Sequence, residues 1–144
     1  MPMSATQPAT KMFDGLPIIR DTVRPGPPRI AVKEKGRILF IDLLQIVSIH
    51  AEGNYVLLQK GSTSYLLRES ISGLMEKLKP YGFIRIHRSF LVNSSMVEEI
   101  HPHATGEYRV RLKGGHEYPV ARSYRKNLKS LADFWIGSKG FLGD

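Results

Sequence analysis

One stretch of this sequence constrains the fold more than any other, because it sets cationic side chains within apolar, β-prone residues. It reads Phe83-Ile84-Arg85-Ile86-His87-Arg88-Ser89-Phe90-Leu91-Val92-Asn93. Its apolar members require burial, and we expect core positions for Phe83, Ile84, Ile86, Phe90 and Val92. That burial leaves the polar members on a rigid exposed platform, namely Arg85, His87, Arg88 and Ser89. No acidic residue between Glu76 and Glu98 neutralises this platform, so the stretch predicts a surface suited to phosphates and base edges.

The overall charge of the chain points in the same direction. The 144 residues carry a formal net charge of +8, and the pI is about 9.9. Such a balance favours a polyanionic partner, which is either nucleic acid or an anionic membrane surface. Basic proteins without a polyanionic partner also exist, so the charge alone leaves this choice open.

The cysteine count and the apolar segments limit where the protein works. The sequence contains no cysteine, which excludes disulfides, cysteine zinc sites and a thiol nucleophile and fits a reducing compartment. No apolar run is long enough to cross a bilayer, and the N-terminus lacks the apolar segment of a secretory signal. We therefore expect a cytoplasmic protein with no membrane attachment.

Three regions of the chain differ in composition. Residues 1–28 hold six of the nine prolines, which are Pro2, Pro8, Pro17, Pro25, Pro27 and Pro28. Because proline resists both helices and central strands, we predict a flexible arm there. The apolar content of 42% suffices for one core, and residues 29–136 are predicted to form a single domain. The glycine-rich residues 137–144 are predicted to form a flexible tail.

The patterned region predicts a mostly β fold (β-rich α+β) of short antiparallel strands with two short helices. Strands are expected over residues 30–33, 37–41, 46–51, 55–60, 64–68, 108–112 and 116–121. The first helix is marked by an apolar stripe of Ile71, Leu74, Met75 and Leu78. Ser70 can cap its start, and Pro80 with Gly82 ends it. The second helix is marked by Tyr124, Leu128, Leu131 and Trp135, with Ser123 as its N-cap.

The strand over residues 108–112 shows the clearest alternation in the sequence. It predicts one core face, formed by Tyr108, Val110 and Leu112. The other face is predicted to be fully cationic and is formed by Arg109, Arg111 and Lys113. The following Gly114-Gly115 permits a two-residue turn with positive φ. Because Tyr108 and Tyr118 share the apolar parity, core packing is a better interpretation for them than stacking on bases.

Arg122 lies where the last strand meets the last helix. The N-terminus of a helix offers unpaired N–H groups and partial positive charge, which suit a phosphate. The first two turns of this helix carry Arg125, Lys126 and Lys129. Their positive charges are unfavourable beside the positive end of the helix dipole, so their presence there indicates a bound anion. A solvated helix face is the alternative. Arg122 itself could read guanine, because the guanidinium fork matches the O6 and N7 acceptors.

Other polar positions carry similar hypotheses. Arg88 is an equivalent guanine reader, with structural pairing to a glutamate of residues 98–99 as the alternative, whereas Arg85 is interpreted as structural. Asn54 and Tyr55 end a loop that contains glycine. Asn54 either adopts a left-handed turn conformation or hydrogen-bonds adenine.

An enzymatic function is not predicted. His101-Pro102-His103 has no third metal ligand nearby, and His87 with Ser89 does not make a catalytic triad. The sequence has neither a Walker-type phosphate loop nor a glycine fingerprint after a strand. We therefore predict no catalytic residue, no metal and no cofactor.

Three ordered motifs resemble those of the LytTR family of bacterial DNA-binding domains. The segment Ile46-Val47-Ser48-Ile49-His50-Ala51-Glu52-Gly53-Asn54-Tyr55 is similar to the opening of that family, with His50 where glutamate is usual. The stretch over residues 83–93 is similar to its signature. The segment Tyr118-Pro119-Val120-Ala121-Arg122-Ser123-Tyr124 is similar to its closing motif. The resemblance covers about residues 30–134.

The resemblance implies an antiparallel β fold whose loops enter successive major grooves of double-stranded DNA, commonly at paired direct repeats. It implies base contacts from Asn54, Tyr55, Arg88 and Arg122. It also implies phosphate contacts from His87, Ser89, Ser123, Arg125 and Lys126. The function is then that of a sequence-specific transcription regulator. A single-stranded nucleic-acid or RNA-binding β module and a protein-interaction domain remain the alternatives.

In the LytTR family, a phosphoacceptor receiver domain usually precedes the DNA-binding domain. Only the proline-rich arm precedes it in this sequence, and the arm is too short for a receiver fold. We therefore expect a stand-alone regulator that is controlled by its expression level or by a separate regulatory partner protein. A homodimer on DNA is expected from the paired repeats.

Overall fold

The computed structural model describes residues 12–13, 16–17 and 25–137. Within the predicted arm, β1 (Met12–Phe13) and β2 (Leu16–Pro17) pair as short antiparallel strands. The rest of residues 1–24 and the predicted tail over residues 138–144 lie outside the described residues. The flexible arm and the flexible tail therefore stay predictions.

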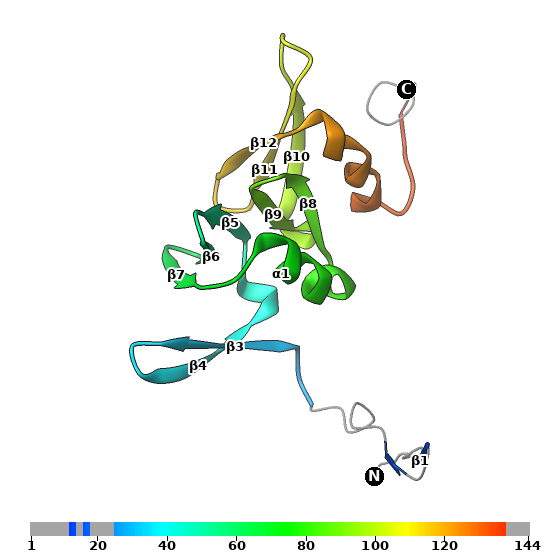
Figure 1. Ribbon diagram of the computed structural model, residues 1–144. Helices are drawn as coiled ribbons and strands as arrows, with labels where there is room; N and C mark the ends of the chain where they lie inside the picture. Colours follow the sequence, from blue (N-terminus) through cyan, green and yellow to red (C-terminus); the bar gives the residue numbers. More distant parts are fainter. Residues whose placement is uncertain (1–11, 14–15, 18–24, 138–144) are drawn as a thin grey trace.

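Antiparallel strands dominate the described chain, which confirms the predicted fold class (Figure 1). A central sheet has the strand order β7-β6-β5-β9-β8. Its strands are β5 (Ser48–Glu52), β6 (Tyr55–Lys60), β7 (Thr63–Leu67), β8 (Phe83–His87) and β9 (Phe90–Asn93). A hairpin lies at one end of the molecule, formed by β3 (Arg29–Glu34) and β4 (Arg37–Asp42). A three-stranded sheet lies at the other end, formed by β10 (Val97–Pro102), β11 (Tyr108–Leu112) and β12 (Glu117–Val120).

Helical segments lie between these strands and after the last of them. They are η2 (Leu43–Gln45), α1 (Ile71–Leu78), η3 (Lys79–Tyr81), η4 (Ser94–Met96) and η5 (Arg122–Leu131). α1 and η5 correspond to the two predicted helices, and η5 is a 3-10 helix. They pack near opposite sides of β8, the last strand of the central sheet (Figure 1).

The central sheet carries a core on each face, because neighbouring residues of a strand point to opposite sides. Leu91 of β9 belongs to a buried cluster that the β3–β4 hairpin and α1 complete, with Val32 and Leu74 among its members. Val92, the next residue, belongs to a second cluster that β10–β12 and η5 complete, with Leu128 among its members. The sheet is therefore held from both faces and gives a rigid base to the loops at its ends.

Burial along the 83–93 stretch largely follows the prediction. Phe83, Ile86 and Val92 are buried, whereas Ile84 and Phe90 are half-buried. Ile84 stays partly exposed because β8 is an edge strand of the sheet and a groove opens beside it.

A β-bulge separates two residues that were expected to share one platform. The pairing of β8 with β9 shifts register between Arg85 and His87. One extra residue in a strand changes the direction in which the following side chains point. His87 consequently packs against Phe90, with ring centroids 5.0 Å apart, while the Arg85 side chain bonds Ser72 of α1. The prediction of a common exposed platform is wrong on this point.

The two helices begin differently. α1 has the predicted cap, because Ser70 Oγ accepts a hydrogen bond of 2.9 Å from the Gly73 N–H. For η5, the predicted N-cap Ser123 is wrong: the cap position is Ala121, and no side chain caps the helix. The Ala121 N–H donates to the Ile86 carbonyl at 2.8 Å. This bond keeps the backbone extended up to Ala121, so the helix begins at the residue that follows Ala121, which is Arg122.

Candidate nucleic-acid interface

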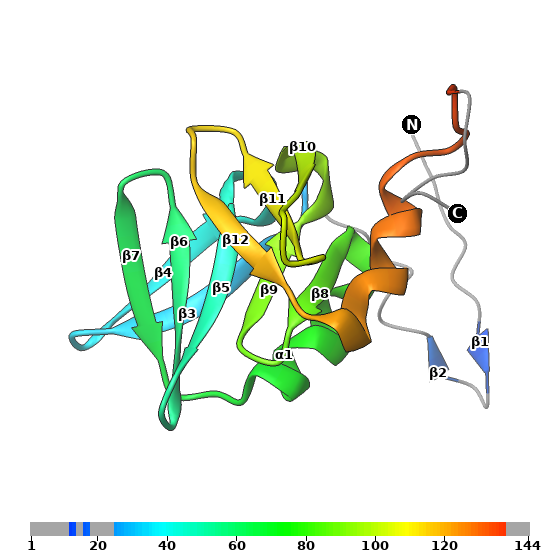
Figure 2. The same ribbon diagram turned by 90° about the horizontal axis from the view of Figure 1, so that it is seen from above.

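Three segments that bear the predicted contact residues lie on one side of the molecule. They are the β5–β6 turn at residues 53–54, the β8–β9 turn at residues 88–89, and the start of η5 at residues 122–126. In Figure 2 they lie along the lower edge of the view. The fold thus brings together three segments that are far apart in the sequence.

Backbone hydrogen bonds fix these segments to one another. The Ala51 N–H, near the end of β5, donates to the Ser89 carbonyl in the β8–β9 turn at 2.9 Å. The bond from Ala121 to Ile86 joins the start of η5 to β8. Because both bonds are between backbone groups, they join the three segments through the main chain.

The β8–β9 turn presents Arg88, which is exposed. Its alternative role, a structural pair with a glutamate of residues 98–99, is not formed in the described part of the chain, where Glu99 pairs with Arg111 and His101. Beside it, His87 Nδ1 accepts a hydrogen bond of 3.1 Å from the Ser89 N–H. Because Nδ1 accepts this bond, Nε2 is the ring nitrogen that is left to donate.

The β5–β6 turn presents Asn54, which is exposed. Gly53 has a φ of 63°, and Lys35 is the single non-glycine residue with positive φ among those described. The interpretation of Asn54 as a left-handed turn residue is therefore wrong. Tyr55 accepts a hydrogen bond of 3.2 Å from Arg68 Nη1, and the Arg68 guanidinium lies 5.5 Å from the centre of the Tyr55 ring.

Sequence reasoning missed Arg68, although the pattern contained a signal for it. The register pairs Val56 with Leu67, so the residue after Leu67 must lie opposite Tyr55. An exposed cation is thereby placed next to the β5–β6 turn.

The start of η5 presents exposed side chains at Arg122, Ser123 and Lys126. Arg125 differs from them, because its Nη2 donates to the Gly106 carbonyl at 2.8 Å. Its guanidinium also lies 4.4 Å from the centre of the Tyr108 ring. Arg125 therefore braces η5 against the β10–β11 loop, in addition to adding positive charge near the helix start.

The face of β11 that was predicted to be fully cationic is partly neutralised. Arg109 Nε lies 3.5 Å from Glu117 Oε1, and Arg111 pairs with Glu99. The carboxylates come from the neighbouring strands β12 and β10, which the alternation within β11 alone could not reveal. Lys113, the third member of that face, is exposed.

A buried polar cluster lies behind the turns, between the central sheet and β12. Ser48 Oγ is 3.0 Å from Tyr118 Oη and 3.2 Å from His50 Nε2. The His50 ring packs edge-on against Phe90 and Tyr118. Burial lowers the pKa of His50 below its usual 6.5, and this outweighs the raising effect of the Glu52 charge.

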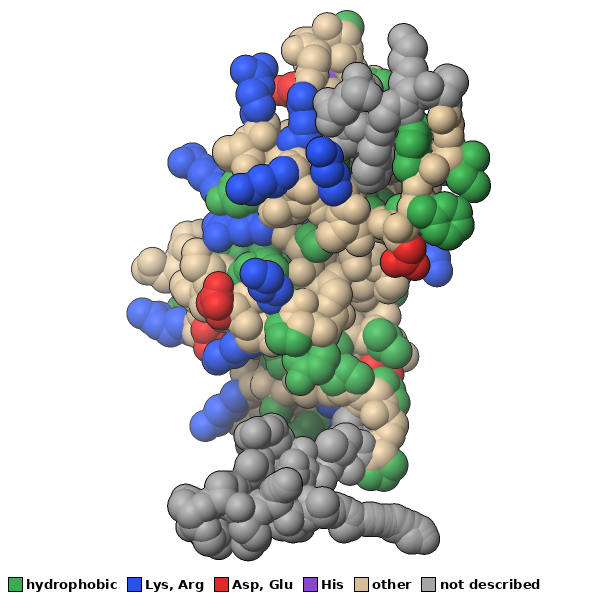
Figure 3. Space-filling model, turned by 90° about the vertical axis from the view of Figure 1, so that its right-hand side faces the viewer, with side chains coloured by type: hydrophobic (Ala, Val, Ile, Leu, Met, Phe, Trp, Pro, Cys, Tyr) green, Lys and Arg blue, Asp and Glu red, His purple; other side chains and the backbone are tan. Residues whose placement is uncertain are grey.

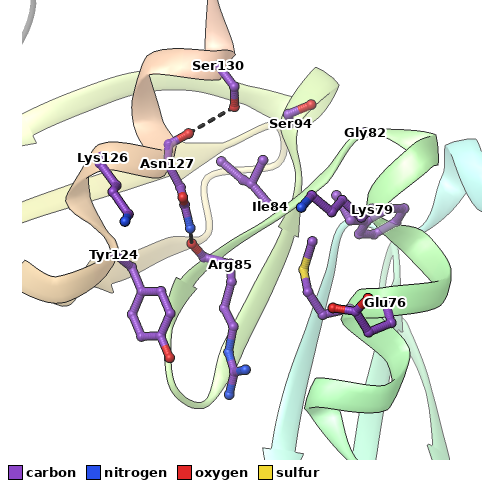
Figure 4. A pocket seen from close by; sticks show the side chains of 12 residues that line it. Glu76, Lys79, Gly82, Ile84, Arg85, Ser94, Tyr124, Lys126, Asn127 and Ser130 are labelled. Atoms are coloured by element: carbon purple, nitrogen blue, oxygen red, sulfur yellow. Dashed lines mark hydrogen bonds between the residues drawn. The ribbon is translucent and has the colours of Figure 1, made fainter.

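A groove of about 600 Å³ opens beside β8, between α1 with η3 and the helix η5 (Figure 4). Its floor includes Phe83 and Ile84, and its walls carry Lys79 and Lys126. Many of the Lys and Arg side chains of the face shown in Figure 3 gather toward the left of the view. The opposite edge in that view is mainly uncharged.

Neither a metal-binding cluster nor a membrane-spanning helix is found in the part of the chain that the structure describes. No group of three or more potential metal ligands occurs there. No helix there is long and apolar enough to cross a membrane.

These features define a small antiparallel β domain that presents basic turns on one side. Its fold matches a solved "LytTr DNA-binding domain of putative methyl-accepting/DNA response regulator" from Bacillus cereus with a TM-score of 0.65 at 21% identity, over 76% of this chain and 100% of the other. The family described as LytTr DNA-binding domain matches residues 36–133. The chain belongs to the LytTr DNA-binding domain family.

Curated relatives agree with this assignment. The sensory transduction protein LytT of Bacillus subtilis (strain 168) is 32% identical over 106 residues, which are 74% of this chain and 44% of that protein. The transcriptional regulatory protein YpdB of Escherichia coli (strain K12) is 41% identical over 69 residues, which are 47% of this chain and 28% of that protein. The chain thus spans less than half the length of these relatives.

Proposed function

We propose that this protein is a transcription regulator that binds specific sequences of double-stranded DNA through the β5–β6 turn, the β8–β9 turn and the start of η5. The observation that carries the proposal is the arrangement of the β5–β6 turn, the β8–β9 turn and the start of η5 on one side of a rigid sheet, each with exposed polar or cationic side chains. Membership in the LytTr DNA-binding domain family and the regulatory names of the relatives support it.

The proposal assigns two kinds of contact. Base edges in the major groove are read by Asn54, Tyr55, Arg88 and Arg122. The Asn54 amide matches the N6 donor and N7 acceptor of adenine, and the two guanidinium groups match the O6 and N7 acceptors of guanine. Phosphates are bound by His87, Ser89, Ser123, Arg125 and Lys126, which fix the register of the domain on the duplex. On this proposal, residues 29–136 are the DNA-binding domain.

The wider biological arrangement is proposed on the same basis. Two copies bind paired direct repeats, so that dimerisation takes place on DNA. A separate regulatory partner protein controls the activity. Two copies on one face of the duplex require sites separated by a whole number of helical turns, each of roughly 10 base pairs.

Selection from a random duplex pool at about 150 mM salt tests this function, because non-specific binding is weak at that ionic strength. Enrichment of a short motif is the expected result, and two copies about one turn apart would support paired binding. Retention without a motif would contradict sequence-specific reading. The single-stranded DNA and RNA alternative would then be measured next, although the burial of Tyr118 gives it no stacking platform on β12.

Two variants distinguish a contact that reads a base from a contact that only binds a phosphate. Arg122→Ala is expected to cost about 1–3 kcal/mol on the preferred site and to relax selectivity at one base pair. Lys126→Ala is expected to weaken binding to all sequences alike and to reduce the salt slope by about 1. Equal losses on every sequence from both variants would show that Arg122 is not a base reader.

A further inference from the structure

We propose that Arg85 is a positioning residue for DNA reading, which fixes the turn that presents Arg88 and couples this turn to η5. The inference rests on the proposed function and extends it, since Arg85 itself is not assigned a contact with DNA. Its guanidinium contacts the β8–β9 turn, α1 and η5, and each contact restricts the movement of the β8–β9 turn.

The first contact is with the β8–β9 turn itself. Arg85 Nε donates to the His87 carbonyl at 3.2 Å, and Arg85 Nη2 donates to the Arg88 carbonyl at 2.5 Å. These two carbonyls lie on either side of the Arg88 backbone unit. One planar guanidinium that holds both of them fixes the orientation of the peptide groups from which the Arg88 side chain projects.

The turn needs such a brace because its own strand pairing is irregular. The register of β8 and β9 shifts between Arg85 and His87, and a bulge leaves one residue outside the ladder of hydrogen bonds. The Arg85 side chain spans this irregular part of β8 and supplies bonds from the side. Among the described residues no carboxylate pairs with Arg85, so its guanidinium is not drawn away from the turn.

The remaining contacts join the turn to α1 and η5. Arg85 Nη1 donates to Ser72 Oγ of α1 at 3.1 Å, and the guanidinium lies 5.4 Å from the centre of the Tyr124 ring of η5. The Arg85 carbonyl accepts a bond of 2.7 Å from Asn127 Nδ2 of η5. Figure 4 shows Arg85 and Tyr124 side by side, with the Asn127 bond above them. The element that carries Arg122 is thus tied to the strand that leads to Arg88.

Lysine and arginine differ in the property that this role requires. Lysine keeps the positive charge but has no planar fork, so it cannot hold two carbonyls in one plane while it lies over an aromatic ring. Arg85→Lys therefore preserves attraction to phosphates and removes the positioning. Arg85→Gln removes both. Lys79→Gln is the matched control for lost charge, because Lys79 lies on the opposite wall of the same groove (Figure 4).

The test measures the affinity of the full chain for its selected duplex and for a scrambled duplex at the same salt concentration. For Arg85→Lys we expect scrambled-duplex affinity within about twofold of wild type, because the charge is kept. We expect the ratio of selected to scrambled affinity to fall about tenfold, as for the loss of one or two hydrogen bonds from a charged group. Lys79→Gln is expected to leave this ratio unchanged.

Amide hydrogen exchange of the free protein provides a second readout that does not involve DNA. The Ala51 N–H donates to the Ser89 carbonyl of the turn, so its exchange reports on turn opening. Arg85→Lys should speed the exchange of the Ala51 amide and leave amides in the middle of β5 and β6 at wild-type protection. Faster exchange throughout the sheet would indicate general destabilisation instead of positioning and would overturn the inference.

The outcomes separate this inference from the proposed function. A wild-type protein without any preference for one duplex would refute the proposed function. A selective wild-type protein whose ratio is unchanged in Arg85→Lys would refute the positioning role alone. A reduced ratio together with faster Ala51 exchange supports both.

Discussion

The buried hydroxyl pair between Ser48 and Tyr118 allows a quantitative test of how the three-stranded sheet is attached to the central one. Ser48 is fully buried, and its Oγ lies 3.0 Å from Tyr118 Oη. Tyr118→Phe removes one hydroxyl and leaves Ser48 Oγ with His50 Nε2 as a partner at 3.2 Å. We therefore expect a loss of about 1 kcal/mol in the free energy of unfolding, which is the usual net value of one hydrogen bond.

Ser48→Ala has a larger expected cost. It removes the partner of the nearly buried Tyr118 hydroxyl and also the partner of His50, so polar atoms are left unsatisfied. The expected loss is about 1–3 kcal/mol. Because the two residues share one bond, the double variant should be less destabilised than the sum of the single variants. The expected coupling is about 0.5–1.5 kcal/mol.

Urea unfolding of the four proteins at about pH 7.5 measures these values, with the m-value as a check that the same surface is exposed in each. Additive effects within about 0.3–0.5 kcal/mol would refute the reasoning, because additivity is the behaviour of sites that do not interact. A changed m-value would mean that the denatured state had changed, and the cycle would then be repeated with Ser48→Cys, whose thiol is a weak donor.

The remaining predictions concern pH and charge. Burial lowers the pKa of His50 in the folded protein below the 6.5 of the unfolded chain, so the unfolded chain takes up its proton first as the pH falls, and stability is lost below about pH 6.5. Thermal unfolding at about pH 7.5 and 5.5 should show a smaller fall in stability at the lower pH for His50→Gln than for wild type. An equal fall in both proteins would mean that another group causes it. Arg68→Gln should weaken binding to every duplex and lower the salt slope by about 1, as for a phosphate contact. A loss confined to the selected duplex would instead show that Arg68 acts in base reading, either directly or through its contact with Tyr55.

Local patterns in the sequence predicted most of the elements. The Gly114-Gly115 turn has φ values of 92° and 90°, which only glycine adopts easily. The apolar stripe and the Ser70 cap predicted α1 correctly. In these cases the information lies within a few residues, so tertiary structure did not need to be known.

The errors arose where contacts between distant segments decide the structure. Ser123 is a good capping residue, but the backbone bond from Ala121 to the distant Ile86 carbonyl sets the start of η5. The cationic face of β11 is partly neutralised by Glu99 and Glu117, which come from other strands. The bulge in β8 changed the direction of His87, and a period of two cannot indicate a bulge.

If DNA is read through the turns as proposed, stability and selectivity should be separable, because the buried clusters lie on both faces of the sheet and not in the turns. Tyr118→Phe weakens the attachment of two sheets but leaves the bonds of the β8–β9 turn intact, so it should lower stability with an unchanged ratio of selected to scrambled affinity. Arg85→Lys loosens the turn while Phe83 and Leu91 stay buried, so it should lower that ratio with a smaller change in unfolding free energy. If both variants changed both quantities in proportion, selectivity would depend on the folded fraction alone, and the turns would not be positioned independently of the cores.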